Sequence, residues 1–397
     1  MKTVMILGAG IYQVPLIKQA KKMGLRVIVV SYKGNYPGIQ LADIFLDINT
    51  TDCEAVLLAA QKYNIDAILT TGTDVCVPTL GYVADKLNLT GPSYDAACKS
   101  MNKVLMKQAF KEHGVKTAQH GVFNQREDGF KFAEKIGFPV MVKAPDSSGS
   151  RGISKVQSAE EFDQAWDLAA KISRVGSVIV EQYLEGIEFG AQAFICGDKV
   201  MEVLPHGDTV TPPPYCSPIG HSIPADLSED ILQKTRCLID SAAKALDLKN
   251  CVANVDLMLV GDEPYILEIG GRMGATCLPE NISIYSGQNV YEYLIRSALG
   301  ESVSFEVRAK QPNACLLLRS GKSGIIEDII IPDSVKNHPD LVEIQLDYCI
   351  GDSVNKYRIG PDRIGHIIVK GNSAKQAEDL AEKLNSEIVI KVKDAEE

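Results

Sequence analysis

Short apolar runs alternate with amphipathic stretches over roughly the first 95 residues of the chain. The apolar runs predict strands at 4–7, 26–30, 44–48 and 67–70. The stretches at 14–23 and 52–63 have helical spacing, and Thr51 or Asp52 is suited to cap the second helix. This alternation predicts an α/β unit, a parallel sheet with helices on both faces.

After Gly91-Pro92 the pattern becomes that of an α+β protein. We expect two short helices at 93–114, later helices at 159–170, 229–246 and 373–384, and strands at 139–143, 153–156, 177–181, 190–204 (as a hairpin), 314–318, 324–331, 341–346, 365–370 and 387–392. The stretches 205–224 and 272–285 are expected to be loops. We therefore predict three domains, at 1–95, 96–311 (with a lid over about 115–190) and 312–397.

A predicted hairpin at 255–269 carries two unusual carboxylates. Its apolar runs, 255–260 and 265–269, flank a turn and contain Asp256 and Glu268 respectively. A carboxylate inside a buried strand is costly unless it is paired or bound to a metal, and Mg²⁺ prefers carboxylate oxygens together with phosphates. Two interpretations follow: strand-edge acids that face solvent, or a floor for Mg²⁺ and nucleotide phosphates.

Composition narrows the function classes. A hydrophobic content of 45% and a charged content of 23% are typical of a globular protein. The net charge of −10 argues against nucleic acid as a partner. No apolar run approaches the roughly 18 residues that span a membrane, and the chain opens directly on a strand, so we expect a cytoplasmic protein without a membrane partner. Ten cysteines without a C-x-x-C pair are expected to be reduced thiols.

Two nucleotide-binding motifs are incomplete. The turn Gly8-Ala9-Gly10 lacks the third glycine of a dinucleotide site, because position 13 is Gln13, and no acid follows the second strand. Gly321-Lys322-Ser323 lacks the first glycine of a P-loop, because position 316 is Leu316. We expect a plain turn there.

A third pattern suits a polyphosphate. Lys143 ends a predicted strand, and the small, glycine-rich stretch 146–152 follows it. Glycines let backbone N–H groups approach phosphate oxygens, and lysine supplies a point charge. The alternative is a hairpin turn with an incidental lysine.

The order of these features resembles the ATP-grasp superfamily, in particular carboxylate–amine (or thiol) ligases of the biotin carboxylase, carbamoyl phosphate synthetase and phosphoribosylglycinamide synthetase type. The resemblance covers nearly the whole chain and runs through Lys103, Lys143, the glycine-rich stretch, Glu181 with Glu188, and Asp256 with Glu268. It implies an ATP-grasp fold with a Rossmann-like N-terminal (pre-ATP-grasp) domain and a small C-terminal α+β domain.

The resemblance also implies roles for individual residues. Lys103 and Lys143 would contact ATP phosphates under a lid formed by Ser148, Gly149, Ser150, Arg151 and Gly152. The Glu181 side chain and the backbone of Tyr183 and Leu184 would meet adenine, and Glu188 would meet ribose. Asp256 and Glu268 would bind Mg²⁺, or Mn²⁺ in its place, and Arg272 would lie against the acyl substrate or its phosphate.

Two positions depart from the family pattern. Asp256 stands where many relatives carry Glu, and Gly270 stands where they carry Asn. The missing Asn leaves a metal ligand to water or to a bidentate Glu268, so the number of metal ions stays open. The sequence from Glu268 to Arg272 is similar to the amino-acid ligase branch, which makes dipeptides and related amides.

The implied reaction is a ligation in two steps. A carboxylate attacks the γ-phosphorus of ATP while Lys143 and Arg272 neutralise the developing charge, and an amine (or thiol) then attacks the acyl phosphate. The expected partners are an amino acid or other small carboxylate and an amine, and the resemblance suggests a homodimer. The alternatives are a purine-pathway ligase for a phosphoribosylamine, although the N-terminal domain shows no additional Arg/Lys cluster for its phosphate, and a non-catalytic ATP-binding regulatory protein.

Four further residues are candidates for substrate contact. Thr73 and Asp74 follow a predicted strand of the parallel sheet, where ligands gather. His206 and His221 lie in the predicted loop at 205–224, where either would bind a substrate carboxylate or accept the amine proton. The alternative is that both are loop histidines packed by neighbouring prolines.

Overall fold

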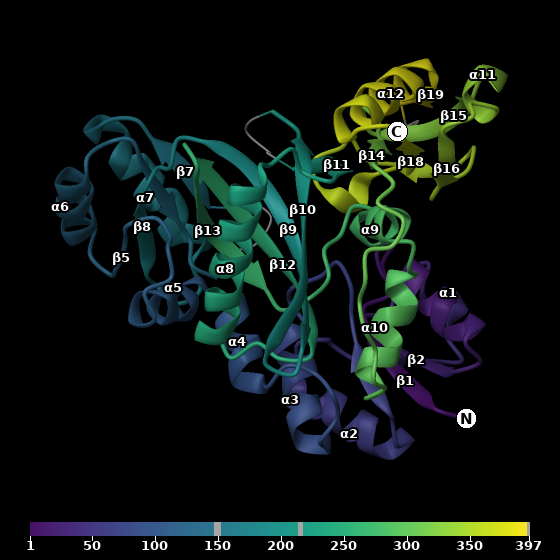
Figure 1. The fold of residues 1–397 in the computed structure, drawn as a ribbon, viewed down its shortest axis with the longest axis horizontal. Helices are drawn as coiled ribbons and strands as arrows, with labels where there is room; N and C mark the ends of the chain where they lie inside the picture. The colour runs from purple at the N-terminus through teal and green to yellow at the C-terminus, as the bar shows by residue number, and fades with distance from the viewer. Residues whose placement is uncertain (147–151, 213–216, 395–397) are drawn as a thin grey trace.

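The computed structural model describes residues 1–146, 152–212 and 217–394. Within these ranges the chain forms four β-sheets, with helices packed against their faces (Figure 1). The predicted mixture of α/β and α+β architecture is confirmed.

The N-terminal unit is a parallel sheet of strand order β3-β2-β1-β4. Alternate strand residues enter two cores: Met5 packs with α2 and α3, whereas Ile6 packs with α1 and α10. Its elements are β1 (Thr3–Leu7), α1 (Val14–Lys22), β2 (Arg26–Ser31), η1 (Ile39–Leu41), β3 (Ile44–Asp47), α2 (Cys53–Tyr63), β4 (Ala67–Leu69) and α3 (Val77–Leu87). Helix α10 (Val290–Ala298) comes from much later in the chain and lies beside this unit in Figure 1.

Two helices, α4 (Tyr94–Met101) and α5 (Lys103–Glu112), lead into an antiparallel sheet of order β5-β8-β6-β7. Its elements are β5 (His120–Phe123), α6 (Arg126–Ile136), β6 (Val140–Lys143), β7 (Ile153–Val156), η2 (Ala159–Glu161), α7 (Phe162–Ile172) and β8 (Val178–Gln182). Helices α6 and α7 pack on the sheet around Phe162 and Trp166. This unit lies within residues 115–190, the range in which we expect the lid, and is the left-hand lobe of Figure 1.

The central sheet is antiparallel and has the order β13-β12-β9-β10-β11-β14-β18-β16. Its strands are β9 (Ile187–Cys196), β10 (Lys199–Val210), β11 (Pro218–Ile223), β12 (Cys251–Val260), β13 (Glu263–Gly270), β14 (Asn313–Leu318), β16 (Leu341–Leu346) and β18 (Gly365–Lys370). Because β11 pairs with β14, the sheet continues through the expected domain boundary at 312.

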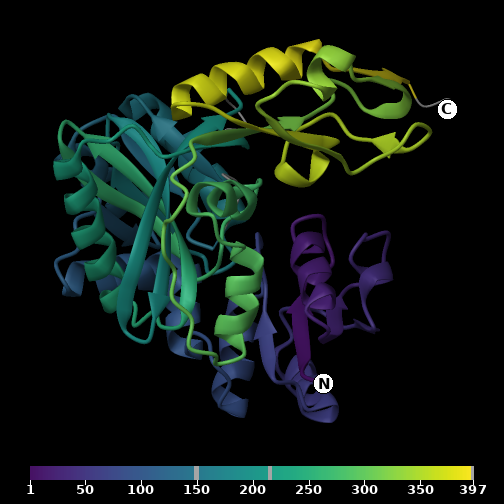
Figure 2. The same ribbon diagram turned by 45° about the vertical axis from the view of Figure 1, so that its right-hand side comes forward.

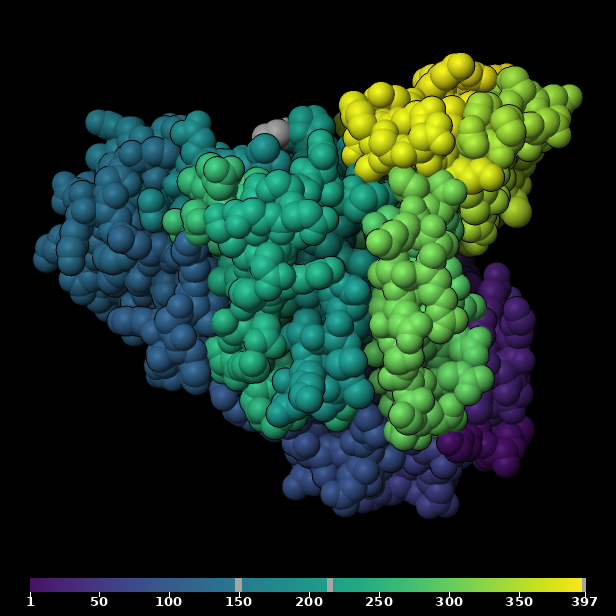
Figure 3. Space-filling view, viewed as in Figure 1, coloured from purple at the N-terminus to yellow at the C-terminus, as the bar shows by residue number. Residues whose placement is uncertain are grey.

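Helices α8 (Glu229–Ala245), α9 (Leu278–Ser286) and α12 (Ala374–Glu387) pack on the central sheet. A small sheet completes the C-terminal segment from β17 (Ser353–Val354), β15 (Gly324–Ile330) and β19 (Val389–Lys393), with α11 (Asp333–Lys336) and η3 (Gly360–Asp362) nearby in sequence. Figure 2 shows this segment lying across one end of the molecule, and Figure 3 shows the surface notched between it and the N-terminal unit.

Two expected loops are wrong. Most of 205–212 and 217–224 belongs to β10 and β11, and 272–285 contains most of α9. In the first case the prolines, Gly207 and the polar inward residues hide the apolar alternation of a strand. In the second case Pro279 occupies the first turn of a helix, where proline is tolerated. Helix α3, likewise with a proline in its first turn, is an addition to the predicted elements.

Phe194 gives a test of the core that supports the central sheet. Its ring is fully buried on β9, stacks on Phe305 with ring centroids 3.6 Å apart, and meets Tyr293 edge-on. We expect Phe194→Ala to lower the free energy of unfolding by about 3–5 kcal/mol, because it removes a large buried ring and leaves a cavity. Urea unfolding followed by circular dichroism measures this. Tyr32→Ala, at a ring 57% exposed, is the control, and equal shifts in the two variants would contradict the assignment.

Candidate active site

The predicted acidic hairpin is confirmed. Strands β12 and β13 pair antiparallel across a turn at Gly261, and Asp256 lies directly opposite Glu268. Residues directly opposite in an antiparallel pair point to the same face of the sheet. Burial, and then the charge of Glu268, raise the pKa of Asp256 to about 7. A pair of close carboxylates that resist joint ionisation fits a divalent cation, which would relieve their repulsion.

Lys103 reaches the same carboxylates from the first turn of α5. The side chain of Asn102 caps this helix by accepting the N–H groups of Val104 and Leu105. The Lys103 ammonium lies 3.0 and 2.9 Å from the two oxygens of Glu268. Lysine and metal would therefore share one carboxylate, and the predicted phosphate contact of Lys103 stays a prediction.

Lys143 lies in a second, more deeply buried cluster. Its ammonium bonds one oxygen of Glu181, and Lys107 lies 3.2 Å from the other oxygen. Although burial opposes ionisation, the charges of Lys143 and Lys107 lower the pKa of Glu181 to about 2. The Glu181 side chain, expected to meet adenine, is thus engaged by two lysines. Sequence reasoning missed Lys107, although it lies one helical turn after Lys103 on α5.

The remaining residues expected to bind the nucleotide lie where the chain passes from β8 to β9 of the central sheet, or in the stretch 148–152. Tyr183 follows β8 and lies under the ammonium of Lys155, 3.7 Å from the ring centroid. Leu184 is buried, and Glu188 on β9 has a pKa raised by burial and by the charge of Asp208. Ser148, Gly149, Ser150 and Arg151 lie outside the described residues. Gly152 has φ +68°, a conformation that favours glycine.

The N-terminal unit supplies Asp74 to this region. Thr73 and Asp74 follow β4, as expected, and Asp74 accepts a 2.5 Å bond from the guanidinium of Arg272. The backbone N–H of Gly72 also bonds the carbonyl of Met273. The charges of Asp74, Asp256 and Glu268 outweigh burial and raise the pKa of Arg272, so the arginine stays charged beside the acidic pair. Thr73 is half-buried next to this ion pair.

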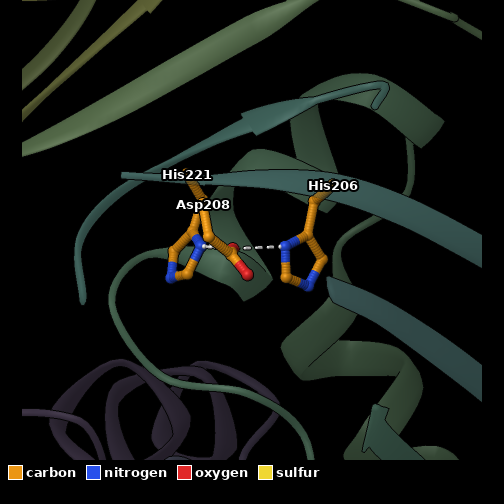
Figure 4. Close-up of side chains that lie close together, drawn as sticks. All are labelled: His206, Asp208 and His221. Carbon is orange, nitrogen blue, oxygen red and sulfur yellow. Dashed lines mark hydrogen bonds and ion pairs between the residues drawn. The ribbon is translucent and has the colours of Figure 1, made fainter. Parts of the chain in front are cut away.

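His206 and His221 lie on adjacent strands, β10 and β11, and both bond one carboxylate oxygen of Asp208 (Figure 4). Sequence reasoning missed Asp208. The available signal was the spacing His206-x-Asp208, because alternate residues of a strand share one face. Asp208 is close enough to the hairpin for its charge to contribute to the raised pKa of Asp256.

One sheet thus carries paired carboxylates, and Lys103 contacts one of them from a helix N-terminus. Lys143 lies on a second sheet, where its charge acts on Glu188 of the central sheet. This arrangement would suit a metal-bound polyphosphate.

Comparisons with known proteins agree with this class. The family described as phosphoribosylglycinamide synthetase, ATP-grasp (A) domain, matches residues 101–210, and the L-amino acid ligase C-terminal domain 2 matches residues 316–393. The crystal structure of phosphoribosylglycinamide synthetase from Anaerococcus prevotii is 32% identical, covers 99% of this chain and 100% of its own, and superposes with a TM-score of 0.85. The chain belongs to the ATP-grasp superfamily.

Two further known proteins are similar to this chain. L-amino acid ligase from Bacillus licheniformis has the same fold, with a TM-score of 0.82 at 20% identity over 99% of both chains. The formate-dependent phosphoribosylglycinamide formyltransferase of Synechococcus sp. is 27% identical over 354 residues, 84% of this chain and 87% of the relative. No helix in the described residues is long and apolar enough to cross a membrane.

The acidic pair predicts an unusual pH dependence of stability. Because the folded-state pKa of Asp256 lies above its ordinary value of 3.8, the favourable contribution of its protonated form is complete below that value and is lost as the pH rises through about 7. In EDTA, we expect Asp256→Asn to raise the melting temperature clearly at pH 8 and little at pH 6, where Asp256 is mostly neutral already.

Differential scanning fluorimetry at the two pH values measures this difference. Asp163→Asn removes an exposed carboxylate from α7 and is the matched control. An Asp256→Asn effect of the same size at both pH values would contradict the electrostatic description of the hairpin.

Proposed function

We propose that the protein is an ATP- and Mg²⁺-dependent ligase that joins the carboxylate of an amino acid or small metabolite to an amine, through an acyl phosphate, and releases ADP and phosphate. The observation that carries this proposal is the half-buried pair Asp256 and Glu268, flanked by Lys103 and Arg272. A cytoplasmic location and a homodimer stay predictions.

The residues present suit a metal bound between the acids. Asp256 and Glu268 would hold it, and the ion would supply charge neutralisation at the terminal phosphate. Asn254 lies directly opposite Gly270, where relatives carry the missing Asn. The Asn254 amide donates to Asp256 at 3.2 Å, so it orients an acid and adds no ligand oxygen on this side.

The cations of the site suit phosphoryl transfer to a carboxylate. Lys103, Lys143 and Arg272 would neutralise charge as a substrate carboxylate attacks the γ-phosphorus. Arg272 is held against the acids by Asp74, so its position needs the N-terminal unit. Neither buried thiol nearby suits covalent catalysis, because burial raises the pKa of Cys76 to about 12 and a bond to Cys315 raises that of Cys277 well above its usual value.

The function is tested by ADP release from ATP and Mg²⁺ with pools of L-amino acids and other small carboxylates, each combined with pooled amines. Turnover that needs both a carboxylate and an amine supports the ligase. Binding of ATP without ADP release under any combination would favour the regulatory alternative.

Glu268→Gln tests the metal assignment at nearly constant shape. Loss of one carboxylate charge removes several kcal/mol of charge stabilisation, which corresponds to a decrease in ADP formation of at least about 100-fold. Glu263→Gln is the matched control on the same strand, because Glu263 is exposed and pairs with Lys116 and Lys234. Normal turnover by a folded Glu268→Gln protein would exclude the metal role.

A phosphoribosyl substrate is the second candidate, favoured by the names of the relatives above. The missing basic pocket has a counterpart outside the N-terminal unit: Arg319 and Lys356 line a cavity of about 550 Å³ in the C-terminal segment, and no carboxylate among the described residues pairs with either. ADP release with phosphoribosylglycinamide and formate, or with phosphoribosylamine and glycine, but not with the pooled acids and amines, would support this candidate instead.

A further inference from the structure

A row of bonded polar side chains crosses four adjacent strands on the face that carries the acidic pair. From β12 to β11 it runs through Asn254, Gln192, His206, Asp208 and His221. The row begins at Asp256, which accepts from Asn254. Buried polar groups bonded in sequence along a substrate-facing sheet are costly to assemble unless every member is satisfied.

The direction of the bonds that His206 makes follows from Gln192. Its Oε1 accepts the backbone N–H of Gly274 at 2.9 Å, so its amide nitrogen must donate. That nitrogen lies 2.6 Å from Oδ1 of Asn254 and 3.2 Å from Nε2 of His206. Since Nε2 of His206 accepts a hydrogen bond here, its Nδ1 carries the hydrogen and donates to Asp208 at 2.8 Å. Both ring nitrogens of His206 are therefore engaged.

His221 differs from His206 in this respect. Its Nδ1 donates to the same oxygen of Asp208 at 2.6 Å, which leaves a lone pair on Nε2. Figure 4 shows this second nitrogen directed away from Asp208. The two histidines together hold the pKa of Asp208 far below its usual range despite burial, and burial keeps the pKa of His221 low. The cluster thus presents one neutral, oriented imidazole nitrogen.

The spacing along the sheet suits a substrate between the acids and His221. Asp256, Gly190 and His206 are successive cross-strand neighbours, and Asp208 lies opposite His221. Adjacent strands lie about 4.8 Å apart, so three strand spacings place β11 about 14 Å from β12. The His206 ring packs over Gly190 on the intervening strand, because a Cβ at Gly190 would lie 2.1 Å from that ring.

We propose that Nε2 of His221 is the base that accepts the proton of the incoming amine in the ligation, with Asp208 as the residue that positions it. This inference rests on the proposed ligase function. A substrate ammonium loses one proton to Nε2, and the amine lone pair forms the new C–N bond. The acyl C–O bond then breaks, its electron pair leaves with phosphate, and the phosphate takes up the second proton that the nitrogen must lose to become an amide. The imidazolium formed is stabilised by the Asp208 carboxylate.

A divalent transition-metal ion is the competing occupant. The three potential ligand atoms lie within 4.8 Å of one another. However, both Nδ1 atoms already donate hydrogens to Asp208, and a metal would need those lone pairs. The hydrogen bonds of His206 and His221 to Asp208 therefore favour a hydrogen-bonded network over a metal site.

The test compares two acceptors at pH 7 after ATP-dependent activation of pooled L-amino acids and small carboxylates. Hydroxylamine is a neutral nucleophile at this pH and needs no base, whereas an alkyl ammonium or amino acid does. We expect His221→Gln to lower amide formation by about 100-fold or more and to leave hydroxamate and ADP formation in hydroxylamine largely unchanged. His113→Gln, the same substitution on the exposed end of α5, should match wild type in both assays.

Different results would contradict the ligase function and the role of His221 as a base. A wild-type protein that releases no ADP and forms no hydroxamate with any pool contradicts the proposed function. Wild-type ligation with an unimpaired amide rate in folded His221→Gln protein overturns the base alone. A stoichiometric metal in the purified wild type that is lost in His221→Gln also overturns it.

A measurement on the wild-type protein covers the case in which the variant fails to fold. In ¹⁵N spectra of histidine-labelled protein, the inference requires both His206 and His221 as the Nδ1–H tautomer. The Nε2–H tautomer at His221 would overturn it. Asp208→Asn should reverse the tautomer of His221 and reproduce the loss of amide formation with hydroxamate retained, as expected of a positioning residue.

Discussion

Asp256 and Glu268 lie directly opposite each other on β12 and β13, where burial and the charge of Glu268 oppose ionisation of Asp256. A sheet that holds two carboxylates on directly opposite residues needs cations around them. Lys103 and Arg272 supply two, and Arg272 in turn bonds Asp74. The position of the N-terminal unit against the central sheet is therefore tied to the acidic pair. In the proposed ligase, the charges that hold these two parts together are the ones that would act on a phosphate.

The register of the central sheet determines which side chains meet on this face. Because side chains alternate, a shift of one residue in β10 would turn His206 and Asp208 to the opposite face. Gly190 is the gap in the row, and the imidazole of His206 occupies the space that a side chain there would take. The position of the histidine cluster relative to Asp256 thus follows from the pairing register across β12, β9, β10 and β11, and the register of β12 with β13 places Glu268 opposite Asp256.

Local sequence patterns predicted much of this arrangement. They failed where an element depends on contacts with residues far away in the sequence. The parallel sheet and the hairpin that carries Asp256 followed from apolar periodicity, because their buried faces are apolar. The part of β10 after residue 204 and strand β11 did not, because the inward face near His206 and His221 is polar and only pairing across strands satisfies it. The contact of α10 with the N-terminal sheet joins segments more than 200 residues apart, and no pattern within either segment encodes it.

The two lysine–carboxylate clusters differ in a way that explains Lys107. Lys103 bonds both oxygens of Glu268, so a metal on that carboxylate and the lysine compete for the same atoms. Glu181 is more deeply buried, and an isolated charge there would be costly. Lys107 remains beside Glu181 if Lys143 moves to a phosphate, so the buried carboxylate keeps a partner throughout. In the proposed ligase, Lys143 is therefore free to exchange partners because a second lysine, invisible to motif reasoning, holds the charge that it leaves behind.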